Sequence, residues 1–257
     1  MEKVQTQKPI LTISLLSSNR RDTIRKCLDS LKILRERVPS ELIIVDTSQD
    51  KEMRKLLEEY TDKIIPFTWC NDFSKARNVG LDAAKGEWFL YLDDDEWFMD
   101  TVEIEEFFLS GDYKEYTLAY YLQRNYSDYA GTNFLDARVS RMFRIWNQIR
   151  FVSSIHEYPD PIIGKTRLLH SVVEHYGYVY DTEEKRYQHF WRNVTLLQDM
   201  IKKERKIPAG GCSFCRNTAI LVSILKWQNA AKRQFQFFRR RKIHFPELQW
   251  GLSIMRY

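Results

Sequence analysis

Cysteine and long apolar runs are both scarce in this chain of 257 residues. Its four cysteines are too few and too scattered for a disulfide scaffold, so we expect a reducing, cytoplasmic setting. The first apolar run, residues 10–16, is too short for a signal peptide or a membrane span. No later stretch reaches membrane length without charges. These absences argue against a secreted disulfide-rich domain and against a membrane-spanning protein.

Charge is distributed unevenly along the chain, although the formal net charge is only +5. Residues 205–257 contain eleven Lys or Arg and one acid, which gives +10, whereas the preceding 204 residues contain 29 basic and 34 acidic residues, which gives −5. An apolar content of 44% excludes a disordered chain. We therefore expect a folded, mildly acidic body of residues 1–204 and a basic tail that needs a separate explanation.

Strands and helices alternate along the body. Buried strands are predicted by four apolar stretches, at residues 10–16, 41–46, 63–66 and 88–92. Helical spacing of apolar side chains follows three of them, at residues 22–37, 50–60 and 73–85. This order is typical of an α/β fold with a mostly parallel central sheet flanked by helices. Its site lies at the carboxyl ends of the strands, where we expect Asp46 and Asp93 to be close together.

The run from Trp88 to Glu96 is the most informative stretch, because a buried strand ends there in four consecutive carboxylates. These acids repel one another, so a positive group is expected among them. Alternate residues of an extended chain point the same way, which places Asp93 and Asp95 on one face. Two carboxylates on one face suit a hard cation such as Mg²⁺ or Mn²⁺. The alternative is a solvated acidic turn or helix N-terminus.

Several motifs, in order along the chain, resemble those of family-2 glycosyltransferases. They are Ser17-Ser18-Asn19-Arg20, Glu41-Leu-Ile-Ile-Val-Asp46-Thr-Ser48, Asn71-Asp-Phe-Ser-Lys-Ala-Arg77-Asn78-Val-Gly80 and Leu92-Asp-Asp-Asp-Glu96. Three later pieces resemble a branch that includes bacterial peptide (glycocin) and surface-polysaccharide glycosyltransferases: Ser140-Arg-Met-Phe-Arg144, Ile155-His-Glu157 and His175-Tyr-Gly-Tyr178. One departure is that the usual acidic pair after the second strand is Asp46-Thr47 here, so a single carboxylate remains to contact the nucleoside.

The resemblance implies the GT-A fold, a Rossmann-like domain that binds a nucleotide-diphosphate sugar, most simply a UDP-sugar. It also implies a Mg²⁺ or Mn²⁺ ion that stabilises the departing diphosphate. The residues that it assigns to the donor are Ser17, Asp46, Arg77, Asn78, Asp93 and Asp94. Those that it assigns to the metal are Asp93, Asp95 and His156. Without the resemblance, Arg77 reads equally as an exposed helical arginine, and Asp72 as the cap of a helix that begins at Phe73.

The acceptor side of the reaction is also part of this expectation. Inversion at the anomeric carbon by direct displacement needs a general base. Glu157 is the expected base and Glu96 is its rival, while a His156–Glu157 pair that only hydrogen-bonds a loop is the alternative. The expected acceptor is a peptide, a glycan or a cell-surface molecule, with no nucleic acid partner and at most peripheral association with the inner face of the membrane.

A second function must be weighed against transfer, namely a catalytically weakened nucleotide-sugar-binding protein of the same fold. The intact acidic run argues against it. A sugar nucleotidyltransferase would need a Gly-rich loop after the first strand, where this chain has Ser17-Ser18-Asn19-Arg20.

The expected domain is residues 1–204, with a donor half at about 10–100, an acceptor half at about 101–182 and a helix at about 183–204. A helical appendage follows, where the resemblance ends and the charge changes sign. A shifted reading frame across Arg205 to Ala219 permits a sequence similar to the tetratricopeptide-like helices that follow this domain in related transferases. We therefore predict that residues 205–257 are a frame-shifted remnant of a helical repeat region. A natural basic tail is the alternative.

Overall fold

The computed structural model describes residues 8–177, 179–180 and 182–204. The chain divides into two compact units, residues 1–201 and 202–257, and nearly all described residues belong to the first. The expectation about residues 205–257 lies outside the described residues. None of the described helices is long and apolar enough to cross a membrane.

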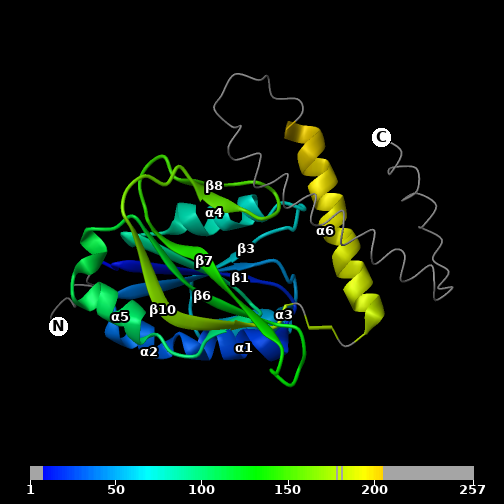
Figure 1. Cartoon of the computed structure of the whole chain (residues 1–257), viewed down its shortest axis with the longest axis horizontal. Coiled ribbons are helices and arrows are strands. Elements are labelled where there is room, and N and C mark those ends of the chain that lie inside the picture. Colours follow the sequence, from blue (N-terminus) through cyan, green and yellow to red (C-terminus); the bar gives the residue numbers. More distant parts are fainter. Residues whose placement is uncertain (1–7, 178, 181, 205–257) are drawn as a thin grey trace. The chain divides into compact units, whose positions relative to one another are not determined.

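The first unit alternates strands and helices up to β5 and is then rich in strands (Figure 1). Its strands are β1 (Leu11–Ser17), β2 (Ser40–Asp46), β3 (Ile64–Pro66), β4 (Trp88–Asp93), β5 (Glu96–Phe98), β6 (Leu118–Tyr126), β7 (Phe134–Arg144), β8 (Arg150–Val152), β9 (Tyr158–Asp160) and β10 (Thr166–His175). Its helices are α1 (Arg21–Ser30), α2 (Lys32–Arg37), α3 (Lys51–Glu58), α4 (Phe73–Ala83), α5 (Val102–Leu109), the short 3₁₀ helix η1 (Asp112–Lys114) and α6 (Glu183–Glu204).

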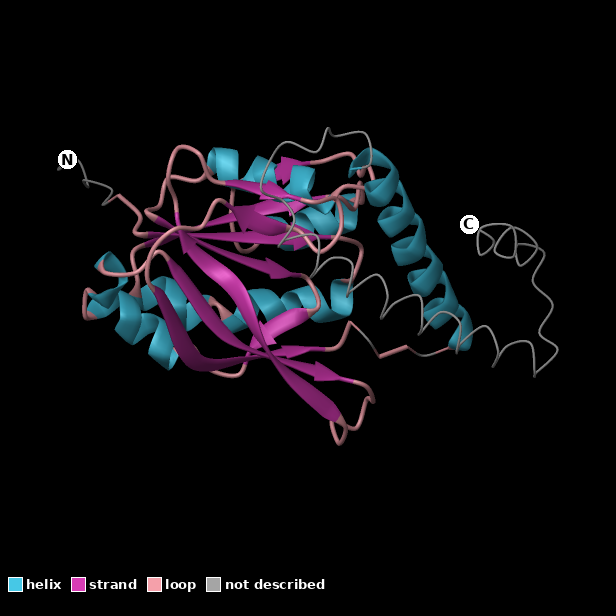
Figure 2. Cartoon of the chain, turned by 45° about the horizontal axis from the view of Figure 1, so that its top comes forward, coloured by secondary structure: helices cyan, strands magenta, loops and turns pink. Residues whose placement is uncertain are grey.

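Eight strands form one twisted sheet in the order β3-β2-β1-β4-β7-β6-β10-β5, and β8 pairs with β9 separately (Figure 2). The pairings among β3, β2, β1 and β4 are parallel, as is that of β6 with β10, while β7 and β5 pair with antiparallel neighbours. Parallel pairings are therefore in the majority, and the predicted Rossmann-like α/β class with a mostly parallel sheet is confirmed.

The sheet carries helices on both faces, because its central strands are apolar on both sides. Leu11, Ile13 and Leu15 of β1 are fully buried in one core, which also contains apolar residues of α1, α2, α3 and α5. Phe89 and Tyr91 of β4 point the other way, into a second core that contains Leu81 of α4. Continuous apolar strands of this kind are the mark of a sheet buried on both faces.

Three details of the helices position the chain around the site. The predicted helix at residues 22–37 is interrupted at Leu31, whose amide bonds the carbonyl of Leu28, so the segment forms α1 and α2. The prediction that Asp72 caps the helix beginning at Phe73, which is α4, is confirmed. The Asp72 side chain accepts a hydrogen bond from the amide of Lys75 in the first turn of that helix. Gly80 lets α4 approach β1 closely, since a Cβ there would fall on the hydroxyl of Ser14.

The carboxyl ends of three parallel strands meet at one edge. Ser17 of β1 pairs with Asp46, and Leu16 pairs with Asp93, so the two acids lie on the two neighbours of β1. Two strand spacings separate such positions, which is about 10 Å. The expected proximity of Asp46 and Asp93 is thus confirmed.

The acidic run does not continue as a strand. The chain turns at Asp94 and Asp95 before β5 begins, so side chains no longer alternate beyond Asp93. The prediction that Asp93 and Asp95 share one face is therefore wrong. Asp93 faces arginines from α4 and β7, whereas Asp95 faces Arg20 and His175.

Candidate active site

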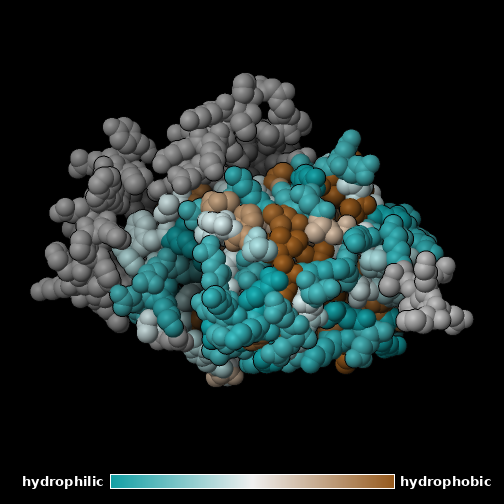
Figure 3. Space-filling view, turned by 180° about the vertical axis from the view of Figure 1, so that it is seen from behind, coloured by the Kyte–Doolittle hydropathy of each residue, from teal (hydrophilic) through white to brown (hydrophobic). Residues whose placement is uncertain are grey.

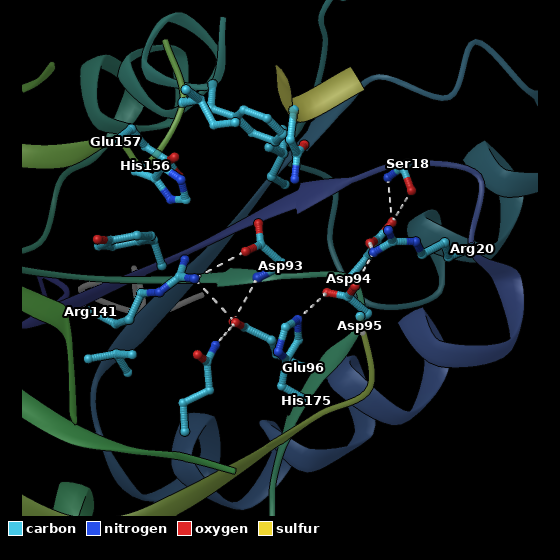
Figure 4. A pocket seen from close by; sticks show the side chains of 18 of the residues that line it. Ser18, Arg20, Asp93, Asp94, Asp95, Glu96, Arg141, His156, Glu157 and His175 are labelled. Carbon is cyan, nitrogen blue, oxygen red and sulfur yellow. Dashed lines mark hydrogen bonds and ion pairs between the residues drawn. The ribbon is translucent and has the colours of Figure 1, made fainter. Parts of the chain in front are cut away.

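A cleft of about 710 Å³ opens at these strand ends. Its lining comes from the β1–α1 loop, the acidic turn, β6, β7, the β8–β9 loop, the end of β10 and α6. Figure 4 shows the acidic turn along the middle of the cleft, with His156 and Glu157 on one side and Arg20 on the other. The face seen in Figure 3 is mostly hydrophilic, with apolar residues gathered near its centre.

Asp93 is held between two arginines. Its carboxylate pairs with Arg77 of α4 through one oxygen, and Arg141 of β7 lies 3.2 Å from the other. Burial opposes the ionised form, but Arg77 and Arg141 outweigh it and hold the pKa of Asp93 well below its usual range. Both guanidinium groups also lie over the ring of Tyr91, at 4.9 and 4.7 Å from its centroid. The oxygens of Asp93 are thus engaged within the protein.

Glu96 is buried behind Asp93 and fully bonded. One carboxylate oxygen accepts from Gln123 of β6 and from Arg141 at 3.2 Å, and the other accepts from the amide of Asp93 at 3.1 Å. Burial raises the pKa of Glu96, although Arg141 opposes the shift. Such a carboxyl supports the wall of the cleft and is poorly placed to take a proton from a substrate.

Arg20, the residue just before α1, brings a positive charge to the acidic turn from the side of β1. Its guanidinium pairs with Asp95 and lies 3.2 Å from Asp94, and its side chain is 42% exposed. Asp94 also accepts hydrogen bonds from the amide and hydroxyl of Ser18, both at 2.6 Å. Burial, reinforced by Asp95 and opposed by Arg20, raises the pKa of Asp94 to about 6.

His175 ends β10 beside the acidic turn. Its Nδ1 lies 2.7 Å from Oδ1 of Asn125, and its Nε2 lies 3.8 Å from Oδ1 of Asp95. The Asn125 amide is oriented by its donation to the carbonyls of Gln123 and Leu135, so its oxygen accepts the Nδ1 hydrogen. In the neutral ring, the lone pair of Nε2 then faces Asp95. Gly177 leaves room for this pair, because a Cβ there would lie 2.7 Å from Oδ2 of Asp95.

Asp95 and His175 could supply two of the ligands of a divalent ion. Two ligand atoms 3.8 Å apart can share one ion, because metal–oxygen bonds of Mg²⁺ are about 2.1 Å long. Among the described residues, no group of three His, Cys, Asp or Glu side chains is arranged to hold a metal. Further ligands would have to be water or diphosphate oxygens, which Mg²⁺ commonly uses.

His156 and Glu157 lie in the β8–β9 loop, across the cleft from Asp95. Glu157 lines the cleft and accepts one hydrogen bond, 3.1 Å long, from Nε of Arg77. His156 has a left-handed backbone with φ of 54°, and burial lowers the pKa of its imidazole. The structure therefore brings both residues to the cleft, but it places His156 across the cleft from Asp95.

Four residues expected at the donor are not among those that line the cleft. Ser17 and Asp46 are buried beneath it, and Asp46 accepts a hydrogen bond from the amide of Ser48. Thr47 lines the cleft beside them, in the position where a second acid was expected. Arg77 is 1% exposed and lies behind the wall. Asn78 uses its amide to bond both the N–H and the carbonyl of Phe151, each at 2.9 Å.

Sequence reasoning assigned no role to four residues that the structure brings to the acidic turn: Arg20, Gln123, Arg141 and His175. Arg20, Arg141 and His175 lay within motifs that carried the resemblance, so their position in those motifs was the available signal. Gln123 stood in no motif. Helix α6 adds His189, Arg192 and Asn193 to the cleft lining. Burial, Arg192 and Arg20 lower the pKa of His189 to about 4.

Comparison with known proteins identifies the family of this chain. Residues 13–220 match the family model described as glycosyl transferase family 2. The chain therefore belongs to this family. It is 26% identical over 230 residues to the SPbeta prophage-derived glycosyltransferase SunS of Bacillus subtilis, a match that covers 84% of this chain and 51% of SunS. The chain spans about half the length of the curated relatives it matches.

Other similarities are more distant. A TPR repeat-containing protein of Synechococcus elongatus is 28% identical over 186 residues, covering 68% of this chain and 44% of that protein. Among solved structures, S. aureus TarS aligns with a TM-score of 0.37 and 20% identity, over 48% of this chain and 22% of TarS. TarS 1–349 in complex with UDP-GlcNAc aligns with a TM-score of 0.38 and 20% identity, over 45% of this chain and 35% of that one.

Proposed function

We propose that the chain transfers a sugar from a UDP-sugar to an acceptor by a metal-dependent, inverting displacement. The observation that carries this proposal is the arrangement of one cleft. Asp95 and His175, which fit a divalent ion, lie at the acidic turn, and the carboxylate of Glu157 lies across the cleft from them. Such an arrangement holds the leaving diphosphate and the attacking group on opposite sides of the anomeric carbon.

The donor end of the cleft suits a nucleoside. It is lined by Thr47, which follows β2, by Trp69, which follows β3, and by Phe73, which begins α4. The two aromatic rings pack edge to face at 4.7 Å. An aromatic wall beside polar groups is typical of a site for a planar base. Asp95 and His175 would hold Mg²⁺ or Mn²⁺, which supplies a Lewis acid that stabilises charge on the leaving diphosphate.

Glu157 is the general base in this proposal, in preference to Glu96. Both carboxylates line the cleft. Among the described residues, Glu157 accepts a single hydrogen bond, from Arg77, so its second oxygen is available to a substrate proton. Both oxygens of Glu96 are bonded within the wall. During transfer, Glu157 would take the proton of the attacking nucleophile as the bond from sugar to diphosphate breaks.

The acceptor is proposed as a peptide, a glycan or a cell-surface molecule, and the reaction as cytoplasmic with at most peripheral membrane association. These assignments rest on the resemblance in the motifs Ser140–Arg144 and Ile155–Glu157. A nucleotide-sugar-binding protein without transfer activity is the second candidate. The ion pair between Arg20 and Asp95 favours it, because this carboxylate is engaged by a protein cation.

A panel of nucleotide sugars tests the proposal. UDP- and GDP-linked sugars would be incubated with and without Mn²⁺, while release of the nucleotide and the melting temperature are measured. We expect UDP release and thermal stabilisation for a UDP-sugar only when the ion is present. Asp95→Asn should abolish both effects, and the matched control Asp82→Asn, at an exposed carboxylate of α4, should keep them. Stabilisation without UDP release, in the presence of acceptors, would favour the binding protein.

A further inference from the structure

Helix α4 is fastened to the loop that carries Glu157. The Asn78 side chain bonds the backbone of Phe151 in both directions, and the amide of Phe73 bonds the carbonyl of Ser154 at 3.0 Å. Within this loop, Ser153 and His156 have positive φ angles of 75° and 54°. Residues hold such conformations only when their surroundings determine them. The path of the loop is therefore set from outside, by α4.

Arg77 extends this fastening to the acidic strand. Its Nε donates to Glu157 at 3.1 Å, its Nη1 donates to the carbonyl of Leu92 at 2.8 Å, and its Nη2 donates to Asp93. Each nitrogen of the guanidinium therefore has a partner, and the three partners come from the loop and from β4. The planar fork of arginine fixes the angles among such partners, which a lysine cannot do.

Arg77 cannot reach a nucleotide from this position. Its side chain is 1% exposed and it does not line the cleft, whereas Asp93 and Glu157 both do. Burial works against its charge, but Asp93 and Glu157 outweigh burial and raise the pKa of Arg77. The charge of Arg77 is therefore balanced by the two carboxylates of Asp93 and Glu157 and is not offered to a ligand in the cleft.

We propose that Arg77 is a positioning residue that fixes the carboxylate of Glu157 relative to Asp93 and the donor, rather than a contact to the donor. The inference rests on the proposed function, because it takes Glu157 as the general base. A base must meet the attacking nucleophile within hydrogen-bond reach, so a small displacement of Glu157 lowers the rate. The same guanidinium bonds Asp93 at the end of β4, so it fixes the position of the Glu157 carboxylate relative to that strand.

A double-mutant cycle on metal-dependent hydrolysis of UDP-N-acetylglucosamine tests this inference. Glu157→Gln should lower the rate by about 10²- to 10⁴-fold, and Arg77→Gln by about 10²-fold, the cost of a misplaced group. If Arg77 acts through Glu157, the double variant should be no slower than Glu157→Gln alone, within about threefold. The affinity for UDP with Mn²⁺ should stay within about threefold in every variant, since Arg77 does not touch the nucleotide.

The matched control is Arg150→Gln. Arg150 is an exposed arginine of β8 that also pairs with α4, through Asp82 at 2.8 Å, but it has no contact with Glu157 among the described residues. We expect this control to keep both the rate and the affinity. Multiplicative rate losses in the double variant, or weaker UDP binding in Arg77→Gln, would overturn the inference.

Failure of the inference is distinguishable from failure of the proposed function. A normal rate in Glu157→Gln would contradict the assignment of Glu157 as the base, and with it the proposed mechanism. A slow Glu157→Gln variant, with multiplicative losses in the double variant, would contradict only the positioning role of Arg77. Where Arg77→Gln does not fold, Arg77→Lys takes its place in the same cycle. It keeps the charge but not the fork, so it should lower the rate less than Glu157→Gln and again add nothing in the Glu157→Gln background.

Discussion

The guanidinium of Arg20 forms an ion pair with the carboxylate of Asp95, the same carboxylate that lies 3.8 Å from Nε2 of His175. Four acids in succession require positive charge, and in this form of the protein arginines supply it. Arg77 and Arg141 form ion pairs with Asp93 within the wall of the cleft, while Arg20 pairs with Asp95 from the more exposed side. Arg20 is thus the one of these three that can be exchanged without opening the core.

Removal of Arg20 should increase the affinity for a divalent ion in the absence of nucleotide. Arg20→Gln leaves Asp94 and Asp95 without their cation, so Mn²⁺ no longer competes with an internal charge. Titration of Mn²⁺, followed by the loss of the free-ion EPR signal, should give several-fold tighter binding than in the parent. Arg25→Gln, an exposed arginine of α1 that pairs with Glu59, is the control and should not differ from the parent. Equal Mn²⁺ affinity in all three proteins would mean that Arg20 does not occupy the place of the ion.

Stabilisation by UDP should require Mg²⁺ or Mn²⁺. A bare diphosphate is repelled by the acidic turn, and an ion held by Asp95 and His175 offsets that repulsion. Thermal melting of the parent with UDP should therefore shift upward only with the ion. Asp95→Asn should stay folded but show no ion-dependent shift. A shift of the same size with EDTA present would remove the basis for placing an ion at Asp95.

The first half of the fold could be predicted from the sequence because its signals are local. The strands before Asp93 are continuous apolar runs, their helices have a regular apolar spacing, and parallel strands bring their carboxyl ends together without knowledge of the rest. The capping role of Asp72 also follows from nearby residues. The location of the site was therefore predictable, and so was the need for positive charge.

The identity of that positive charge was not predictable, because it depends on pairings distant in sequence. Arg141 reaches Asp93 because β7 lies beside β4. His175 reaches Asp95, which lies 80 residues earlier in the chain, because β10 pairs with β5. The prediction of the side-chain direction of Asp95 was wrong for a different reason. Alternation holds only while the chain is extended, and a turn of two residues after Asp93 redirects it.

The two candidate bases should respond differently to amide substitution. Glu157→Gln should lower turnover by about 10²- to 10⁴-fold with UDP binding retained, since only proton transfer is lost. Glu96→Gln should instead lower the melting temperature, because Arg141 would lose a charged partner within the wall. Steady-state rates and melting curves of both variants separate the roles. If Glu157→Gln were fully active and Glu96→Gln inactive but stable, Glu96 would be the base and Glu157 the structural carboxylate.

Stability should depend on pH through Asp94. Its pKa in the folded protein is about 6, above the value of 3.8 for a free side chain, so the folded state binds this proton more tightly than the unfolded state. The resulting penalty is absent below pH 3.8, grows as pH rises towards 6 and is constant above it. A shift of this size corresponds to about 3 kcal/mol. Relative to the parent, Asp94→Asn should therefore gain stability between pH 4 and pH 7.

Urea unfolding of the parent and of Asp94→Asn across this range measures that gain. The measurement is made without divalent ions, and groups such as Asp93 and His189 titrate in both proteins, so their contributions largely cancel in the difference. A stability difference that stays constant from pH 4 to pH 7 would show that Asp94 titrates at its ordinary pKa in the folded protein.

Gly177 should be essential to the pair formed by Asp95 and His175. A Cβ at this position would lie 2.7 Å from Oδ2 of Asp95 and closer still to the His175 ring, so Gly177→Ala forces the two ligands apart. We expect loss of the Mn²⁺-dependent stabilisation by UDP, with the melting temperature of the ligand-free protein little changed, because both side chains border an open cleft. Gly111→Ala is a weaker control, since its left-handed backbone adds strain far from the site. If Gly177→Ala binds Mn²⁺ and UDP as the parent does, the ion does not depend on the pairing of Asp95 with His175.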